Sequence, residues 1–242
     1  MEGAVKLCML SRTKREYIVV SVGGSLIVPE GIDTSFLRNL RSLVLEKTQT
    51  GSSFYIIAGG GRLARNYQDA ARDIRGEDTL EREEMDWLGI HSTRLNAHLL
   101  RTIFTEEAQA KIVKNPTHRL RGKESVVVGS GWKPGWSTDY CAVMAAKTLG
   151  AKKLVNLSNI DYVYTADPRK DPSATKIEKI DWASFRKLIP AEWDPGLSAP
   201  FDPVAAREAE LLGLEVAIIN GEKLEEFKNY LDGKPFVGTV IS

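Results

Sequence analysis

Cysteine is scarce in this chain, with only Cys8 and Cys141 among 242 residues. Two such distant cysteines form no disulfide framework, and neither lies beside a metal-ligand pattern. Histidine is almost as rare, and His91, His98 and His118 lack the spacing of HExxH or of another zinc motif. The sequence therefore predicts a reduced, cytoplasmic setting, and it predicts no side chain that ligates a metal.

Long hydrophobic runs and a charge excess of one sign are also missing. The apolar runs have the length of strands, whereas a membrane-spanning helix needs roughly 20 residues. Residues 1–16 are mixed and basic, without the apolar segment of a signal peptide. A formal net charge of +1 offers no electrostatic footprint for nucleic acid or for an anionic membrane. We therefore expect neither a nucleic acid partner nor a membrane partner.

Short β-type runs alternate with helical segments through almost the whole chain. The expected strands are residues 17–22, 54–58, 125–128, 153–157, 215–219 and 238–241. This alternation predicts an α/β fold, a three-layer α/β/α sandwich around a mostly parallel sheet. We expect residues 1–16 to be an N-terminal extension and residues 17–242 to be one domain of two packed lobes, about 17–130 and about 131–242.

Local signals predict where several helices begin and which faces they bury. N-caps are expected at Asp33 or Thr34, at Ser137 or Thr138, and at Asp202. A helix after residue 61 is expected to bury Leu63, Tyr67, Ala70 and Ile74, which follow helical spacing. A solvated connection at 72–82 then leads to a long helix at 85–104, with core positions at Leu88, Leu95 and Leu99.

Two glycine clusters, Gly23-Gly24-Ser25 and Gly59-Gly60-Gly61, stand directly after predicted strands. A phosphate reaches backbone N–H groups only where no Cβ intervenes, and the N-terminus of a following helix favours an anion. Tight turns explain each isolated cluster equally well. Two clusters at strand carboxyl ends favour a phosphate site, because they can face each other across one crevice.

The residues after the second cluster and the segment 129–139 offer polar side chains to such a site. Arg65 is either a solvated surface residue or a guanidinium that forks onto phosphate oxygens. Ser137 and Thr138 either cap a helix or present backbone amides to an anion. The tryptophans of the segment either pack normally or stack on a base. Asp139 either complements the helix dipole or orients cations around a transferred group.

Residues 152–180 carry the most informative pattern in the chain. An apolar run ends at Ser158-Asn159, and a turn-rich segment with Tyr164, Asp167 and two prolines follows. Side chains at the carboxyl end of a buried strand lie where ligands bind in α/β proteins.

Six segments, which follow one another along the chain, carry a resemblance to a known family. They are GGS, GGGRLAR, DWLGIHSTRLNA, PGWSTD, LSNIDYVYTADPRKDP and FDPVAA. The chain resembles the UMP kinases of the archaeal type, in the amino-acid kinase superfamily, over nearly all of residues 17–242. The resemblance implies the amino-acid kinase fold, with an acceptor lobe at about 17–130 and a nucleotide lobe at about 131–242.

The resemblance also implies a role for individual residues. For the ATP phosphates the implied residues are Gly24, Ser25, Gly61 and Arg65. For the ATP nucleoside they are Ser158, Asn159, Tyr164 and Asp167. For UMP they are Gly60 at the phosphate, Asp86 at the ribose, and the loop residues Trp132, Lys133, Pro134, Gly135, Trp136, Ser137 and Thr138. The implied catalytic residues are Arg65 and Asp139, the latter as the organising carboxylate.

The implied reaction is MgATP plus UMP to ADP plus UDP, a step of pyrimidine nucleotide biosynthesis. In-line transfer needs no covalent intermediate and no general base, because the acceptor phosphate is already an oxyanion. The resemblance further implies ATP and Mg²⁺ as cofactors. It implies a homo-oligomer, a hexamer built as a trimer of dimers, with the helix at 85–104 as the dimer element.

The chain departs from the family pattern in three respects, at four positions. Ser21 stands where the superfamily often has lysine, a difference that the archaeal type shares. Tyr162 replaces a glycine, which is unfavourable if the turn needs a positive φ. Trp132 and Trp136 replace smaller or polar residues and bear on acceptor specificity.

Two alternatives remain open from the sequence. One is a superfamily kinase with another acceptor, such as isopentenyl phosphate, carbamate or a small carboxylate. Asp86 argues against an isoprenoid, because a hydrocarbon tail gives a buried carboxylate no partner. The other is a non-catalytic nucleotide-binding or storage protein on the same fold.

Overall fold

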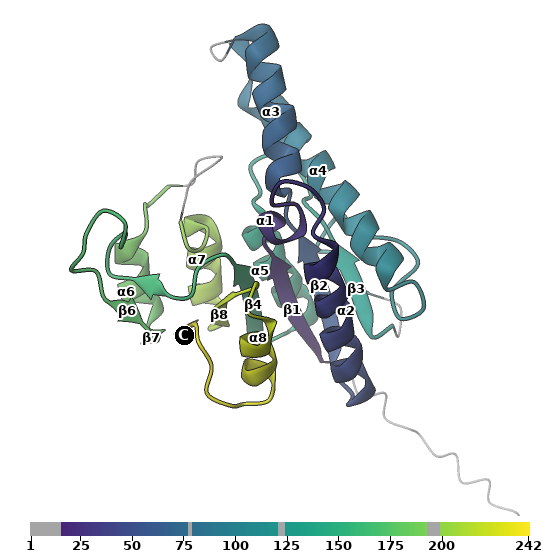
Figure 1. Ribbon diagram of the computed structural model, residues 1–242, viewed down its shortest axis with the longest axis vertical. Helices are drawn as coiled ribbons and strands as arrows, with labels where there is room; N and C mark the ends of the chain where they lie inside the picture. The colour runs from purple at the N-terminus through teal and green to yellow at the C-terminus, as the bar shows by residue number, and fades with distance from the viewer. Residues whose placement is uncertain (1–15, 77–78, 121–123, 193–198) are drawn as a thin grey trace, which may run out of the picture.

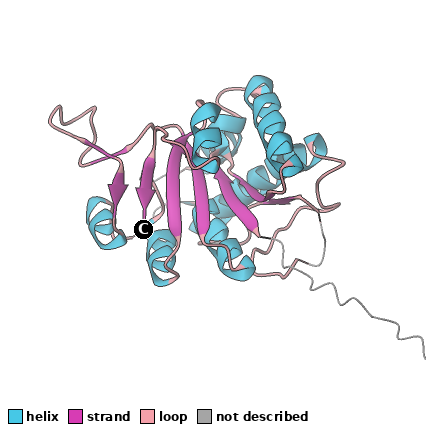
Figure 2. Cartoon of the chain, turned by 90° about the horizontal axis from the view of Figure 1, so that it is seen from below, coloured by secondary structure: helices cyan, strands magenta, loops and turns pink. Residues whose placement is uncertain are grey.

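The computed structural model describes residues 16–76, 79–120, 124–192 and 199–242. The predicted extension therefore lies outside the described residues except for Glu16, as does most of the loop expected at 189–198. The chain builds a seven-stranded sheet of order β3-β2-β1-β4-β8-β9-β7. Helices lie on both faces of this sheet (Figure 2), and the α/β fold is confirmed.

The five strands from the β3 edge to β8 run parallel, and β9 and β7 at the other edge run in the opposite direction. The strands of the sheet are β1 (Tyr17–Val22), β2 (Ser53–Ala58), β3 (Val126–Gly129), β4 (Lys153–Ser158), β7 (Lys179–Ile180), β8 (Glu215–Asn220) and β9 (Thr239–Ile241). Val20 of β1 is in register with Ile56 on one side and with Val155 on the other. β9 runs antiparallel to β8 and parallel to β7. The central strands are almost wholly buried, as expected for parallel strands covered on both faces.

Two helical layers enclose the sheet. The helices are α1 (Gly24–Ile27), α2 (Thr34–Gln49), α3 (Gly61–Arg75), α4 (Arg82–Ile103), α5 (Thr138–Leu149), α6 (Trp182–Leu188), α7 (Pro203–Leu211) and α8 (Leu224–Leu231). One core joins α2, α4 and α8 to the sheet through residues such as Leu40, Leu100 and Phe227. A second core joins α5, α6 and α7 to the other face, through Phe185 and Ala206 among others.

The predicted caps explain where several helices begin. Asp33 Oδ1 accepts the N–H of Phe36 at 2.9 Å, and Ser137 Oγ accepts that of Tyr140 at 3.0 Å. Asp202 Oδ1 accepts the N–H of Ala205 at 2.7 Å. These contacts satisfy N–H groups that have no partner within the first turn of a helix.

A small two-stranded sheet was not expected from the sequence. β5 (Val163–Tyr164) pairs antiparallel with β6 (Lys176–Ile177). Strands of two residues carry no alternating pattern, so only the pairing itself defines them. The hairpin holds the ends of the turn-rich segment together.

The predicted buried face of α3 is wrong. None of its residues is buried, and Tyr67 and Ile74 are 58% and 84% exposed. The helix projects beyond the rest of the molecule (Figure 1). Helical spacing shows that a helix has an apolar side, but it does not show that the same chain covers that side.

The second correction concerns α4 and the connection before it. α3 continues to Arg75 and α4 already begins at Arg82, so the connection is shorter than the predicted 72–82. Leu95, expected in the core, is 61% exposed, whereas Ile90 and Leu100 are buried. The long helix itself is confirmed.

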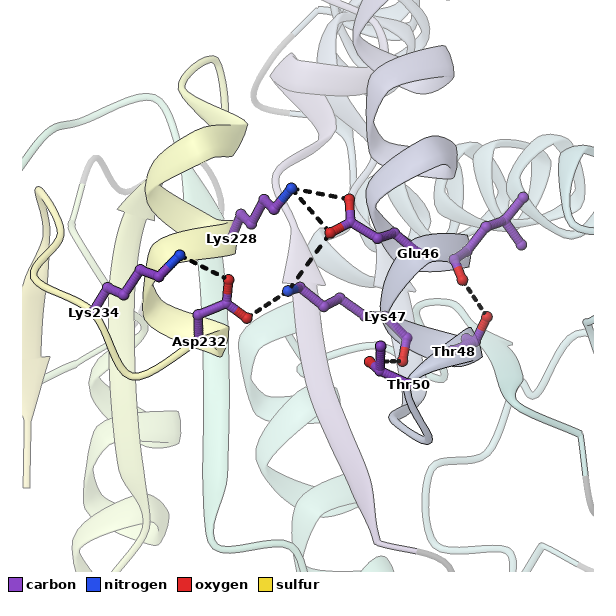
Figure 3. Close-up of polar contacts among 8 residues, drawn as sticks. Glu46, Lys47, Thr48, Thr50, Lys228, Asp232 and Lys234 are labelled. Atoms are coloured by element: carbon purple, nitrogen blue, oxygen red, sulfur yellow. Dashed lines mark hydrogen bonds and ion pairs between the residues drawn. The ribbon is translucent and has the colours of Figure 1, made fainter.

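An ion-pair network links α2 to α8 and to the turn that follows α8 (Figure 3). The Nζ of Lys47 lies 2.5 Å from Asp232, and Lys228 lies 2.9 Å from Glu46. The Lys47 side chain is only 10% exposed. A lysine this buried needs a carboxylate partner, because removing an unpaired charge from water is unfavourable.

No helix among the described residues is both long enough and apolar enough to cross a membrane.

Candidate active site

The predicted site residues gather at one edge of the sheet. β1, β2, β3, β4 and β8 are parallel, so their carboxyl ends meet at this edge. The glycine clusters follow β1 and β2, the segment 129–139 follows the end of β3, and Ser158 ends β4. The topology thus brings together segments that are more than 100 residues apart.

The two glycine clusters lie against each other. A Cβ on Gly24 would come within 2.6 Å of the carbonyl carbons of Gly59 and Gly60, and nearer still to the nitrogen of Gly61. Gly61 has φ +62°, which other residues rarely adopt. The Asn96 side chain donates to the carbonyl oxygen of Gly59 at 2.8 Å. Close backbone packing therefore explains why glycine is needed at Gly24 and Gly61.

Two further predicted phosphate residues adjoin these turns. Ser25 is half-buried in α1, directly after Gly24. Arg65 is exposed in the first turns of α3, the helix that begins at Gly61. An exposed guanidinium beside a helix N-terminus and glycine turns is suited to an anionic ligand.

Asp139 lies in the first turn of α5 and contacts two other elements. Ser21 Oγ donates to its Oδ1 at 3.1 Å, and the backbone N–H of Asp202 donates to its Oδ2 at 3.3 Å. Burial, reinforced by the charge of Asp202, raises the pKa of Asp139 to about 6. The hydrogen bond from Ser21 opposes this rise, since it stabilises the ionised carboxylate.

Asp202 contacts Asp139 through its backbone N–H, and its charge also acts on Asp139. It caps α7 and its side chain is hydrogen-bonded to that of Ser137, and burial raises its pKa. Among the described residues, no group of three or more His, Cys, Asp or Glu side chains is arranged to hold a metal ion. Any cation here would need most of its ligands from elsewhere.

The segment after β3 forms a loop held by α4. Asp86 Oδ2 accepts the N–H of Gly135 at 2.7 Å, and Gly135 has φ +78°. The structure therefore brings Asp86 into contact with the loop of residues 132–138, which the sequence analysis assigned to UMP together with Asp86.

Aromatic rings dominate this loop. The rings of Trp132 and Trp136 meet edge to face with centroids 4.6 Å apart, and Tyr140 continues the row at 4.5 Å from Trp136. Lys133 Nζ lies 4.5 Å from the Trp132 centroid and 5.1 Å from that of Trp136. Pro134 and Gly135 line an adjacent cavity of about 510 Å³ together with Asp86 and Arg207.

The predicted nucleoside residues occupy the segment between β4 and β6. Ser158 and Asn159 lie at the end of β4, and Tyr164 is half-buried in β5. Asp167 instead accepts hydrogen bonds from Arg169 in its own turn, at 3.0 Å from the backbone N and 3.1 Å from Nε. Asp167 thus orders its own turn.

Asp161 anchors this segment to the end of β8, a link that the sequence analysis missed. It accepts hydrogen bonds from Asn220 at 2.8 Å and from Lys223 at 2.7 Å, and these contacts lower its pKa. Tyr162 is tolerated because its φ is not positive, as holds for every non-glycine residue in the described part of the chain. The turn therefore does not need glycine, and the ring of Tyr162 lies 4.9 Å from Lys176 Nζ.

The sequence analysis also did not predict the hydrogen bond from Asn96 to Gly59 or the contact between Asp202 and Asp139. Asp202 was recognised only as a cap, since nothing in the sequence connects it with Asp139, 63 positions away. Asn96 gave no signal beyond its place in the segment RLNA.

Known proteins share this arrangement. The model of the amino acid kinase family matches residues 16–220. The chain belongs to the amino acid kinase family. Within this family the chain is 35% identical over 231 residues to the uridylate kinase of Methanosarcina barkeri, with 93% of this chain and 95% of that protein covered. It is 34% identical to the uridylate kinase of Pyrococcus abyssi, with 93% and 98% covered.

Solved structures of the family agree with the fold. The uridylate kinase of Archaeoglobus fulgidus superposes with a TM-score of 0.77 at 28% identity, covering 93% of this chain and 99% of that one. The aspartate kinase of Synechocystis, at 17% identity and a TM-score of 0.70, shares the fold alone and is covered over 39% of its length. The predicted resemblance to archaeal UMP kinases is confirmed.

Proposed function

We propose that this enzyme transfers the γ-phosphate of ATP to UMP and forms ADP and UDP, a step of pyrimidine nucleotide biosynthesis. The observation that carries the proposal is the agreement between the uridylate kinases of M. barkeri and P. abyssi, which match almost the whole chain, and the site at the carboxyl edge of the sheet. Glycine turns, a carboxylate and an aromatic loop meet there.

The glycine turns are proposed to hold the phosphates. Backbone N–H groups of Gly24 and Gly61 would bind ATP oxygens, and Gly60 would approach the phosphate of UMP. Ser25 and Arg65 would add a hydroxyl and a charged fork. Their close packing supports this role, because the backbone is bare of Cβ atoms where the clusters meet.

The segment after β4 is proposed to enclose the ATP nucleoside. Ser158 and Asn159 would lie on one side, and Tyr164 and Asp167 on the other. The hairpin of β5 and β6 supports this role, since it closes the segment into an ordered turn. Its anchor through Asp161 and Lys223 fixes the turn beside the carboxyl end of β8.

The acceptor is proposed to lie between α4 and the loop of residues 132–138. Asp86 would accept hydrogen bonds from the ribose with its remaining oxygen. The uracil and phosphate would be lined by the loop residues Trp132, Lys133, Pro134, Gly135, Trp136, Ser137 and Thr138. An indole face stacks on any base, so the tryptophans suit a planar acceptor better than a small carboxylate or carbamate.

Catalysis is proposed to consist of positioning and charge neutralisation. Asp139 would orient cationic groups around the transferred phosphoryl group, and Arg65 would balance its charge. Mg²⁺ is commonly held by one or two carboxylates and substrate phosphates, and Asp139 would supply one such carboxylate. When bound, the cation would neutralise phosphate charge.

The test is an ADP-release assay with MgATP and UMP, CMP, dUMP, AMP, GMP or isopentenyl phosphate. Turnover with UMP at least about 10-fold above the other acceptors is expected if the loop is a uracil site. Faster turnover with isopentenyl phosphate would overturn the choice of acceptor. Binding of MgATP without ADP release under any condition would favour a nucleotide-binding or storage protein.

We also propose a homo-oligomer, a hexamer built as a trimer of dimers, with α3 and α4 at the dimer interface. Their exposed apolar residues support this proposal: Tyr67, Ile74, Trp87 and Leu95. The division into an acceptor lobe at 17–130 and a nucleotide lobe at 131–242 is likewise proposed, although the acceptor loop itself follows residue 130. The cytoplasmic location stays a prediction.

A further inference from the structure

One face of α4 holds the acceptor loop at three points. Asp86 accepts the N–H of Gly135 at 2.7 Å, and Thr93 Oγ1 accepts the N–H of Gly131 at 2.8 Å. Arg94 Nη2 donates to the carbonyl oxygen of Trp132 at 2.9 Å. Positions seven and eight residues apart lie on the same side of a helix. These contacts therefore act together on one short loop.

Arg94 differs from the other two contacts in how it is held. Its guanidinium carbon lies 5.7 Å from the ring centroid of Trp87, which is seven residues earlier on the same side of α4. Its Nε is buried and has no acceptor among the described residues. A buried donor without a partner is unfavourable, and such groups are rare in folded proteins. The position of the guanidinium therefore favours its contacts with Trp87 and Trp132, although its own Nε donor has no acceptor among the described residues.

The contact with Trp132 bears on the whole aromatic loop. Trp132 packs against Trp136, and Lys133 lies over both rings. The N–H of Trp136 also closes a turn onto the carbonyl of Lys133 at 3.2 Å. The hydrogen bond from Arg94 to the carbonyl oxygen of Trp132 therefore fixes the peptide plane between Trp132 and Lys133, at the start of the segment that carries both indole rings.

We propose that Arg94 is a positioning residue for the acceptor, which sets the conformation of the loop at 131–136 through the carbonyl of Trp132. This inference rests on the proposed function, since it assigns the loop to UMP. Arg94 acts on the loop and not on the reacting atoms. Its loss should therefore weaken acceptor binding far more than it slows phosphoryl transfer.

The test compares Arg94→Met with Arg101→Met. Arg101 lies on the same helix and also donates to a backbone carbonyl, that of Gln109, at 3.5 Å. It therefore controls for the loss of an arginine from α4. Arg94→Met is expected to raise KM for UMP about 5–20-fold with kcat changed less than about 3-fold and KM for ATP unchanged. Arg94→Lys keeps a donor and is expected to recover part of the affinity.

Amide hydrogen exchange gives a readout that needs no substrate. In Arg94→Met the peptide spanning residues 130–137 should exchange faster, whereas in Arg101→Met the faster exchange should appear around Gln109. Equal KM for UMP in Arg94→Met and the parent protein, or equal rises in both variants, would overturn the proposal. If the parent protein does not phosphorylate UMP, the proposed function fails, and the exchange pattern still decides whether Arg94 holds the loop.

Discussion

At the scale of single residues, Asp139 owes its properties to neighbours that are distant in sequence. Burial and the charge of Asp202 disfavour its ionised form, and the hydroxyl of Ser21 partly restores it. The superfamily lysine that Ser21 replaces would have supplied a positive charge nearby. In this chain Asp139 instead accepts a hydrogen bond from the neutral hydroxyl of Ser21, and the pKa of Asp139 is about 6.

This arrangement predicts how the rate depends on pH. Asp139 is protonated below about pH 6, so kcat/KM for UMP should fall as the pH drops through that value. Ser21→Ala removes the contact that lowers the pKa, and the acid limb should move to higher pH. The phosphate of UMP also titrates near pH 6, but it does so identically with both proteins.

The measurement is the pH profile of kcat/KM between pH 5 and pH 8 for the parent and Ser21→Ala. Ser53→Ala serves as the control, because Ser53 is equally buried in the neighbouring strand but lies at its opposite end. An acid limb that stays in place in Ser21→Ala would contradict the assigned cause.

The contact between the glycine clusters predicts a second effect at this scale. Gly24→Ala forces a Cβ against the backbone of Gly59 to Gly61, which cannot move away as a side chain can. We expect a stability loss of about 1–3 kcal/mol and at least a 10-fold lower kcat/KM, since the phosphate-binding backbone must shift.

Thermal unfolding and the ADP-release assay measure these two effects. Gly31→Ala is the matched control, because a Cβ at Gly31 meets no atom within 4 Å. A Gly24→Ala protein with the parent's activity would argue that the clusters do not bind phosphate.

At the scale of elements, α2 and α8 are joined by charge as well as by apolar contact. Lys47 is mostly buried and pairs with Asp232, whose pKa it lowers. A lowered carboxyl pKa stabilises the fold above the unfolded pKa of about 4 and ceases to do so as the pH falls through the folded value.

Lys47→Met should therefore lower the Tm by about 3–8 °C at neutral pH. The difference from the parent protein should be constant between pH 5 and pH 8 and should shrink below about pH 4. Thermal unfolding followed by circular dichroism measures it. Lys147→Met is the control, since Lys147 also joins two helices through Glu208 but is 51% exposed. Its Tm should change by less than about 2 °C, and an equal change would refute the role of burial.

At the scale of the whole molecule, the exposed apolar side chains of α3 and α4 favour an interface with a partner. Contiguous apolar side chains left in water are unfavourable and mark interaction sites. Ile74 of α3 is 84% exposed, and Leu211 of α7 is 82% exposed. The two residues allow a direct comparison of the proposed interface with another part of the surface.

Ile74→Glu should reduce the oligomer to a smaller species, because a carboxylate buried in an apolar interface has no partner. Sedimentation velocity measures the change in mass. Leu211→Glu should leave the mass unchanged. A loss of mass in Leu211→Glu but not in Ile74→Glu would place the interface elsewhere.

The fold could be predicted from the sequence because its signals are local. Strands covered on both faces are continuous apolar runs, and Asp33, Ser137 and Asp202 mark helix starts by bonds within one turn. Of the candidate site residues, Asp86 could be named only with the help of the family resemblance, and the residues alone left the roles of Gly24 and Asp139 open. Nothing local distinguishes Gly24, which packs on another backbone, from Gly31, which meets nothing.

The sequence by itself therefore determined the α/β class, the order of the central elements and the strand ends at which the candidate site residues lie. Only the tertiary structure decided that Tyr67 and Ile74 face solvent, that burial and Asp202 raise the pKa of Asp139, and that Arg94 contacts the loop after β3. The reason is physical: periodicity and capping arise from bonds within a few residues. Exposure, ionisation and loop position depend instead on which distant segments the fold brings into contact.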